Sequence, residues 1–239
     1  VVVLGAGFSG LLTAVHLLAR PETQVTLVER GPAFGRGAAY GTDNPDHLLN
    51  VRLGNMSAFP DEPDHLARWL AGRAGGAGAD GFIGRGLYGD YLQDLLREAG
   101  GAGGERLRLA AGEAVDLRRV DGTWRVELAD GAAVDGEAVV LAPGNPEPAP
   151  PPGLDPRLAQ SGRYAADPWR GATDLPPEAR HVLLVGTGLT MVDVALELAG
   201  QGRRGTALSR RGLLPRAHAR SGAGAAGHAA GTADWSGSP

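Results

Sequence analysis

Apolar residues fall in short continuous runs and in helical spacing along the start of the chain. An apolar run at residues 1–4 precedes a glycine-rich turn, after which leucines and valines recur every three or four positions over 11–18. A second run follows at 25–29. Continuous β-branched runs are typical of buried strands. Apolar residues at every third or fourth position are typical of a helix that packs on such strands. The pattern therefore predicts a strand, a helix and a second, parallel strand.

The middle of the chain contains a long polar stretch followed by helical and strand patterns. Residues 31–60 are polar and have little periodicity, and such a stretch is usually functional or disordered. We expect helices over 63–70 and 88–99, the second ending before Gly100. The expected strands, with Asp-Gly turns at 121–122 and 130–131, are residues 107–111, 115–120, 123–128 and 138–141.

A proline-rich segment precedes a second strand–turn–helix pattern. Residues 146–152 include five prolines and are expected to form a stiff linker or a surface turn. An apolar run at 181–185 then leads into a second glycine turn, a helical pattern and a strand at 206–209. From residue 221 onward, glycine and alanine dominate without periodicity, so we expect a disordered tail.

The composition excludes several kinds of chemistry. The chain has 239 residues, a formal net charge of −4 and no cysteine, and all 23 of its basic residues are arginines. This excludes disulfides, thiolate metal sites, redox-active dithiols, lysine Schiff bases and P-loops. There is no clustered basic face for nucleic acid, no polybasic patch or long apolar run for a membrane, and no metal-ligand spacing. We expect a cytoplasmic protein without a bound metal.

The first glycine turn has the pattern GxGxxG between a strand and a helix. Gly5 would permit the tight turn, Gly7 would let backbone N–H groups approach a pyrophosphate, and Gly10 would let the helix lie close to the strand. Glu29 ends the second strand, 19 residues after Gly10, where its carboxylate can accept hydrogen bonds from both ribose hydroxyls. A generic turn with a surface acid is the alternative, but together these features favour dinucleotide binding.

The second glycine turn departs from the pattern at its third position. Gly186 and Gly188 occupy the first two positions, but Met191 stands where a small residue is usual. This implies wider helix–strand packing or a helix displaced from the phosphates. Arg210 and Arg211 follow the second strand in place of an acid. A guanidinium suits a ribose 2′-phosphate, which favours NADPH over NADH, whereas a solvated arginine pair is the alternative.

Several further blocks of the chain are distinctive. VVLAPG at 139–144 resembles the strand-to-glycine segment by which flavoproteins with two dinucleotide-binding domains leave the FAD domain. The others are AYGT at 39–42, HLLNV at 47–51, NMSAFP at 55–60, YGDYL at 88–92, DPW at 167–169 and GTGLTMVD at 186–193. Together these others resemble the signature of one bacterial family of FAD/NAD(P)-binding proteins. That family includes FAD-dependent urate hydroxylase and the flavin monooxygenase that oxidises the amine of aspartate to nitrosuccinate. The resemblance extends over residues 1–218.

This resemblance implies an α/β fold with a Rossmann-like FAD-binding domain into which a second dinucleotide-binding, NADPH domain is inserted. We expect the FAD domain over 1–150, the start of the NAD(P)H domain over 151–220 and the disordered tail over 221–239. Family members are longer, so the rest of the NADPH domain and the segment that returns to cover FAD are expected to be absent, as in a fragment or a truncated product. We also expect residues upstream of Val1, because the chain opens within a strand.

The two turns and the resemblance together provide the candidate cofactor-binding residues. By the resemblance, His47, Asn50, Met56 and Ser57 line the flavin side, and Val115 offers backbone hydrogen bonds to adenine; a solvated loop histidine is the alternative for His47. The first turn and its surroundings contribute Gly5, Ala6, Gly7, Phe8, Ser9, Gly10, Glu29, Arg30, Ala142 and Gly144, and the second contributes Gly186, Gly188, Leu189, Thr190, Arg210 and Arg211. No catalytic acid or base is nominated, because a flavin carries the chemistry itself.

Three functions are compatible with these features. The first is an FAD-dependent monooxygenase that consumes NADPH and inserts one oxygen atom of O₂ into a small-molecule substrate. The second is an FAD and NAD(P)H reductase or oxidase without oxygen insertion, outside the disulfide-reductase branch because there is no cysteine. The third is a truncated protein that binds FAD without turnover. The oligomeric state is left open.

Overall fold

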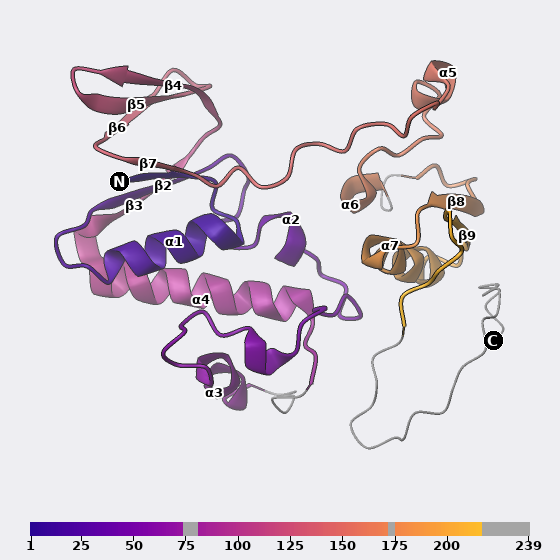
Figure 1. Ribbon diagram of the computed structural model, residues 1–239, viewed down its shortest axis with the longest axis horizontal. Helices are drawn as coiled ribbons and strands as arrows, with labels where there is room; N and C mark the ends of the chain where they lie inside the picture. Colours follow the sequence, from indigo (N-terminus) through magenta and orange to yellow (C-terminus); the bar gives the residue numbers. More distant parts are fainter. Residues whose placement is uncertain (74–80, 172–174, 217–239) are drawn as a thin grey trace. The chain divides into compact units, whose positions relative to one another are not determined.

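The computed structural model describes residues 1–73, 81–171 and 175–216, which belong to two compact units (Figure 1). The first unit is Val1–Pro146 and the second is Glu147–Pro239. The tail expected at 221–239 lies outside the described residues. Within the described ranges, every helix is too short or too polar to span a membrane.

The first unit is layered around a parallel sheet (Figure 1). In spatial order this sheet consists of β3 (Leu107–Ala111), β2 (Val25–Glu29), β1 (Val2–Leu4) and β7 (Val139–Leu141). An antiparallel sheet of β4 (Ala114–Val120), β5 (Thr123–Leu128) and β6 (Ala133–Gly136) covers one of its faces. Helices α1 (Phe8–Leu18) and α4 (Arg85–Gly103) cover the other face.

Alternation along the central strands divides the apolar side chains between two cores. Val3 and Leu27 are buried against the helices, in a core that continues into the buried face of α4. Val2 and Val28 point the opposite way and pack against the antiparallel sheet. The central strands β1 and β2 are therefore buried on both faces, which explains their apolar runs.

The helices of the first unit differ from the expected ranges at their ends. Helix α4 starts before residue 88 and continues past Gly100, because Gly100 and Gly103 face Leu107 and Leu18 at close range and Gly104, with φ of 57°, ends the helix. Residues 31–60, expected to have little structure, contain two short helical segments. The remaining helical elements of this unit are α2 (Gly37–Tyr40), η1 (Leu53–Asn55), α3 (His65–Ala71) and η2 (Gly104–Arg106).

The partner of β5 across the Asp130-Gly131 turn differs from the expected one. The turn leads into β6, a strand that the hydrophobic pattern did not indicate. Of its four residues only Val134 is buried, so no alternating run marks it. The expected strand, β7, instead pairs in parallel with β1, where Val3 lies opposite Val140.

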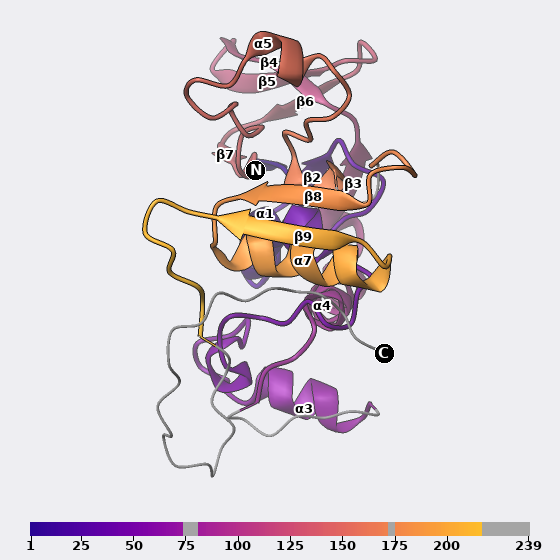
Figure 2. The same cartoon turned by 90° about the vertical axis from the view of Figure 1, so that its right-hand side faces the viewer.

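The second unit contains one parallel strand pair and a connecting helix (Figure 2). Strand β8 (His181–Val185) leads through helix α7 (Leu189–Gly200) to strand β9 (Arg204–Leu208), which begins two residues earlier than expected. Two short helices, α5 (Pro156–Ala159) and α6 (Pro168–Gly171), precede them. Helix α7 covers one face of the pair, whereas Leu183 and Val185 on the other face are 59% and 69% exposed.

Candidate cofactor-binding site

The first glycine turn lies where three parallel strands end. The N–H of Gly5 donates to the carbonyl of Val28 at the end of β2 (2.8 Å), and the N–H of Ala142 donates to the carbonyl of Leu4 at the end of β1 (2.8 Å). Ala142 directly follows β7. In open α/β sheets, ligands bind outside the carboxyl ends of the strands, and this turn occupies that position.

Two of the three turn glycines are required by packing. Gly5 has φ of 95°, and a Cβ atom at Gly5 would overlap the carbonyl of Ala142. A Cβ atom at Gly10 would overlap the carbonyl of Gly5. These two glycines therefore let α1 and β7 approach the turn, whether or not a ligand is bound.

Gly7 differs from both, because neither its backbone nor its packing requires glycine. It caps α1 with extended angles, φ −68° and ψ −169°, and the nearest atom to an added Cβ would be the Cα of Gly37, 3.8 Å away. The open space lies beside the first N–H groups of α1, which helix geometry leaves without intrahelical acceptors. A phosphate fits this space and these donors, and a side chain at Gly7 would fill it.

Glu29 is held in place by the backbone on both sides of its carboxylate. Its Oε2 accepts a hydrogen bond from the N–H of Ala6 (2.7 Å), and its Oε1 accepts one from the N–H of Gly31 (2.7 Å). A carboxylate has about four acceptor positions, so each oxygen can accept a further donor. The residue fits the ribose role expected of it, and its orientation is set in advance.

The start of β4 supplies a backbone edge close to Glu29. The N–H of Gly112 donates to the Glu29 carbonyl (2.9 Å), and Arg30 reaches Glu113 across 3.6 Å. Val115 follows, 60% exposed, at a β-bulge that takes it out of register with β5. Its backbone polar groups thus lie outside the regular ladder, as the expected contact to adenine requires.

A glycine-containing loop that the sequence analysis did not single out borders the turn. The N–H of Gly35, with φ of 100°, donates to the carbonyl of Ala6 (2.7 Å). Arg36 then ties the loop to α4 through an ion pair with Asp90 and a hydrogen bond to Gln93 Oε1 (3.1 Å). The repeated glycines shortly after Glu29 were the sequence signal for this loop.

The four residues expected on the flavin side are in different environments. His47 is 4% exposed, and its Nδ1 lies 2.8 Å from Thr42 Oγ1. Ser57 donates to the carbonyl of Glu62 (2.6 Å), which stabilises a turn, and the carbonyl of Met56 accepts from Tyr88 (3.1 Å). The side chain of Asn50 is exposed. Among these four residues, Asn50 alone is exposed, whereas Met56 and Ser57 are half-buried and His47 is buried.

Aromatic rings lie beside the turn. Phe8, the first residue of α1, is 5.8 Å from the ring of Tyr40, which is 4.9 Å from that of Tyr88. Burial raises the pKa of the Tyr40 hydroxyl, although the charge of Arg85 acts in the opposite direction, and burial also raises the pKa of Tyr88. Both phenols are therefore neutral at physiological pH.

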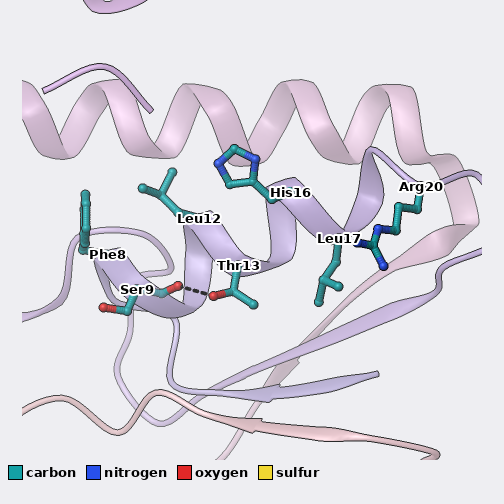
Figure 3. A pocket seen from close by; sticks show the side chains of 7 residues that line it. All are labelled: Phe8, Ser9, Leu12, Thr13, His16, Leu17 and Arg20. Atoms are coloured by element: carbon teal, nitrogen blue, oxygen red, sulfur yellow. Dashed lines mark hydrogen bonds between the residues drawn. The ribbon is translucent and has the colours of Figure 1, made fainter. Parts of the chain in front are cut away.

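An open depression of about 490 Å³ runs along α1 (Figure 3). Its wall is formed by residues of one side of the helix, two of which, Phe8 and Ser9, are candidate cofactor residues. Thr13 Oγ1 donates to the carbonyl of Ser9 (2.7 Å), a bond within the helix. The lining residues are Phe8, Ser9, Leu12, Thr13, His16, Leu17 and Arg20.

The second glycine turn has the same connection to its sheet but more open surroundings. The N–H of Gly186, with φ of 111°, donates to the carbonyl of Leu208 (2.8 Å), and Gly188 caps α7. Among the described residues, no atom lies within 4 Å of a Cβ added at either glycine. Exposed Arg210 and Arg211 follow β9 at this same end of the strand pair.

The remaining candidates lie close to these turns. Gly144, with φ of 74°, is two residues beyond Ala142, and Leu189 and Thr190 open α7, with Leu189 exposed. Within residues 1–73, 81–171 and 175–216, no group of three or more His, Asp and Glu side chains is placed to hold a metal ion.

Strand, glycine turn, helix and parallel strand, with a carboxylate at the end of the second strand, define an α/β dinucleotide-binding fold. The chain belongs to the FAD-NAD(P)-binding family, whose model matches residues 2–146. FAD and NAD(P) are thus the cofactors of its family, as the sequence predicts. Among curated proteins, a search returns no match.

Solved structures of oxygenases share the fold. S-allyl-L-cysteine S-oxygenase from Allium sativum is 22% identical over 92% of this chain and 53% of its own, with a TM-score of 0.56. Lysine monooxygenase NbtG from Nocardia farcinica is 21% identical over 87% and 58%, with a TM-score of 0.53. OTEMO in complex with FAD and NADP is 18% identical over 87% and 38%, with a TM-score of 0.55.

The chain therefore spans between 38% and 58% of the length of these proteins. At such identities the likeness concerns the fold. It confirms the predicted α/β class with a Rossmann-like parallel sheet.

Proposed function

We propose that the chain is the FAD-binding domain and the start of the NADPH-binding domain of a flavin monooxygenase that inserts one oxygen atom of O₂ into a small-molecule substrate. The observation that carries the proposal is the open space at Gly7 beside the N-terminus of α1, with Glu29 fixed next to it. When bound, the flavin supplies the redox chemistry, and the protein supplies binding and orientation.

In this proposal FAD occupies the first turn. The N–H groups at the start of α1, with the positive end of the helix dipole, hold the pyrophosphate. Glu29 accepts the ribose hydroxyls, and the backbone of Val115 contacts adenine. The flavin ring then lies toward the segment that contains His47, Asn50, Met56 and Ser57, and Arg30 borders the adenosine.

NADPH occupies the second turn. Gly186 and Gly188 leave room for its pyrophosphate at the start of α7. Arg210 and Arg211 are exposed at the same end of the strands, just after β9. A guanidinium in this position can bind a 2′-phosphate with charge-assisted hydrogen bonds.

The choice of a monooxygenase is supported by the oxygenases among the solved structures and by the sequence blocks. The blocks at 39–60 and 186–193 favour the branch with urate hydroxylase and the nitrosuccinate-forming aspartate monooxygenase. Urate and aspartate are therefore the first substrates to test.

FAD retention by a Gly7→Val variant tests the first site. A Cβ at Gly7 would be in ordinary contact with Gly37, and the valine side chain would occupy the phosphate space, so the wild-type protein should bind FAD stoichiometrically and the variant should not. Visible absorption after gel filtration measures this. Gly101→Val, at an α4 position with no atom within 4 Å of an added Cβ, is the matched control and should bind FAD like the wild type. A yellow, stoichiometric Gly7→Val protein would contradict the assignment.

Anaerobic addition of NADPH to the FAD-loaded chain tests the proposed reaction. Bleaching of the flavin bands, followed by ¹⁸O incorporation into urate or aspartate under ¹⁸O₂, is the expected result. Bleaching with hydrogen peroxide as the sole oxygen product would instead indicate an oxidase. FAD uptake without bleaching would indicate a protein that binds FAD without turnover.

A further inference from the structure

Aromatic rings form a continuous row from the first glycine turn to the surface of α3. Tyr40 lies next to Phe8 and is 4.9 Å from Tyr88, and Tyr88 is 5.6 Å from Tyr91. The row ends at Trp69 of α3, 5.4 Å from Tyr91. Tyrosine and tryptophan are the side chains most readily oxidised by one electron without sulfur, and rings in near contact exchange electrons by tunnelling. The row therefore consists of the residue types that an electron-transfer path needs, in addition to packing as part of the hydrophobic core.

The hydroxyl groups of the row differ in their acceptors. A phenol that loses an electron becomes a strong acid, so its oxidation is favourable only where a base takes the proton. Tyr88 donates to the carbonyl of Met56 (3.1 Å), which is no base, and Tyr40 lies near the cation Arg85.

Tyr91 does have a base beside it. Its buried hydroxyl accepts a hydrogen bond from the N–H of Ala58 (3.2 Å), and Nδ1 of His65 lies 2.8 Å from the same oxygen. In the Nε2–H tautomer of His65, Nδ1 accepts the phenol proton; the Ser57 side chain also forms a hydrogen bond with this hydroxyl but is not a base. His65 is half-buried, so a proton it takes up can pass on to solvent.

The charges around Trp69 disfavour an oxidised indole, so Trp69 would transfer an electron vacancy rather than retain it. The guanidinium of Arg73 lies 3.7 Å from the centre of its ring, and a cation there opposes the positive charge of an oxidised indole. Its Nε1–H donates to Asp94 (3.0 Å), which also pairs with Arg73. Asp94 could take the indole proton, but a carboxylate is a weaker base than an imidazole, and this one is also paired with Arg73. An electron vacancy at this end of the row is therefore more stable on Tyr91.

We propose that Tyr91 is a redox-active tyrosine with His65 as its proton acceptor. One electron leaves the ring for a strong one-electron oxidant, such as a photoexcited oxidised flavin or a metal complex at the surface. The proton moves from Oη to Nδ1, which gives a neutral tyrosyl radical, an imidazolium and the oxidant reduced by one electron. An electron from a small reductant such as ascorbate, with return of the proton, restores Tyr91. This property does not depend on the proposed monooxygenase function.

Oxidation of the full chain without added cofactor tests the proposal. Photogenerated tris(bipyridine)ruthenium(III) is the oxidant, and electron paramagnetic resonance of the frozen sample is the readout. A tyrosyl signal is expected in the wild type and in Tyr88→Phe, the matched control that also removes a buried hydroxyl of α4. The signal should be lost in Tyr91→Phe. A signal that survives in Tyr91→Phe, or that disappears in Tyr164→Phe, would overturn the proposal.

A His65→Gln variant tests the proton transfer and leaves the ring of Tyr91 in place. Glutamine offers a hydrogen-bond acceptor but no basic nitrogen, so the radical signal should be lost while circular dichroism stays that of the wild type. An undiminished signal would overturn the role of His65. Ring-deuterated tyrosine should narrow the wild-type signal, and a signal unaffected by this label would belong to tryptophan and overturn the assignment to Tyr91. Because no flavin is present, a negative result is distinct from failure of FAD binding.

Discussion

The two glycine turns of this chain have similar backbone conformations but differ in the packing and the charges around them. Gly5 and Gly186 both have positive φ angles, 95° and 111°. Each also donates its N–H to a carbonyl at the end of the neighbouring parallel strand, that of Val28 or Leu208, at 2.8 Å. In the first turn, however, Gly5 and Gly10 are in close contact with backbone, whereas Gly186 and Gly188 have open space around them within the described part of the chain.

This difference shows which properties of a turn are local. The sequence around each turn determines its path from strand to helix, because a glycine at the first position suffices for the left-handed backbone. Close packing instead depends on residues distant in sequence, such as Ala142 after β7. The second strand of each turn also ends in a different charge, because Glu29 is the last residue of β2 whereas Arg210 lies two residues beyond β9.

The largest effect should come from breaking the close packing of the first turn. Gly10→Ala forces a Cβ into the carbonyl of Gly5, and overpacking of this kind should lower the free energy of unfolding by about 3 kcal/mol. Gly188→Ala, at the second position of the open turn, should cost about 1 kcal/mol or less, since nothing within the described residues approaches the new Cβ and only the cap preference changes. Urea unfolding measures both, and equal losses would show that the two turns are packed alike.

A smaller effect is expected from removing the charge of the second turn. Arg210→Ala should weaken NADPH binding by about 10- to 100-fold, from the roughly 1.5–3 kcal/mol of a charged hydrogen bond, and leave NADH binding nearly unchanged. Titration calorimetry with both nucleotides tests this, and Arg216→Ala in the same unit serves as the control. Equal losses for NADPH and NADH would mean that Arg210 does not bind the 2′-phosphate.

Glu29→Gln should destabilise the first unit even without cofactor. An amide offers one oxygen to two backbone donors, so the N–H of either Ala6 or Gly31 would face an NH₂ group. We expect a loss of about 1.5 kcal/mol in the free energy of unfolding. The exposed Glu113→Gln is the control and should have little effect. Unchanged stability of Glu29→Gln would show that the two backbone bonds do not support the turn.

The smallest effect concerns the attachment of α3 to α4 in the first unit. Burial alone would raise the pKa of Asp94, but hydrogen bonds from Arg97 and Trp69 and the charges of Arg97 and Arg73 lower it below its ordinary value. Because the folded-state pKa is the lower one, this stabilisation is present above the unfolded pKa, about 3.9, and is lost as the pH falls through the folded value.

Asp94→Asn should accordingly lower the free energy of unfolding by about 1 kcal/mol at pH 7, and the difference from the wild type should shrink as the pH falls below about 4. Urea unfolding at several pH values measures this change. A difference that stays constant with pH would rule out the titration of Asp94 as its source.

The predictable part of the fold consists of strands that a short, mostly apolar run marks in the sequence. Strands β1, β2, β3 and β8 are found within about a residue of their expected ends, although only β1 and β2 are buried on both faces. Strand β6 was missed because it buries only Val134. The end of α4 was misplaced because Gly100 and Gly103 serve close packing against Leu107 and Leu18, a reason that hydrophobic spacing does not reveal.

The candidate site was predictable in residue type but not in environment. The spacing of the glycines and Glu29 placed them together at the strand ends, as the structure has them. That Gly7 is open whereas Gly5 and Gly10 are packed depends on the path of β7 and of the 35–37 loop. The bulge at Val115 likewise depends on its pairing with β5, which no local pattern announces.

The double anchorage of Glu29 has a consequence for how such sequences evolve. Its carboxylate supports the main chain of the turn before any nucleotide arrives, so selection for folding alone would preserve an acid there. A descendant that had abandoned its cofactor would still carry this residue, and its presence would be a relic rather than a sign of binding. Gly7 is under no such constraint, because the fold has room for a side chain. In a lineage that has lost its cofactor, a substitution of Gly7 would therefore be the first sequence change to indicate the loss.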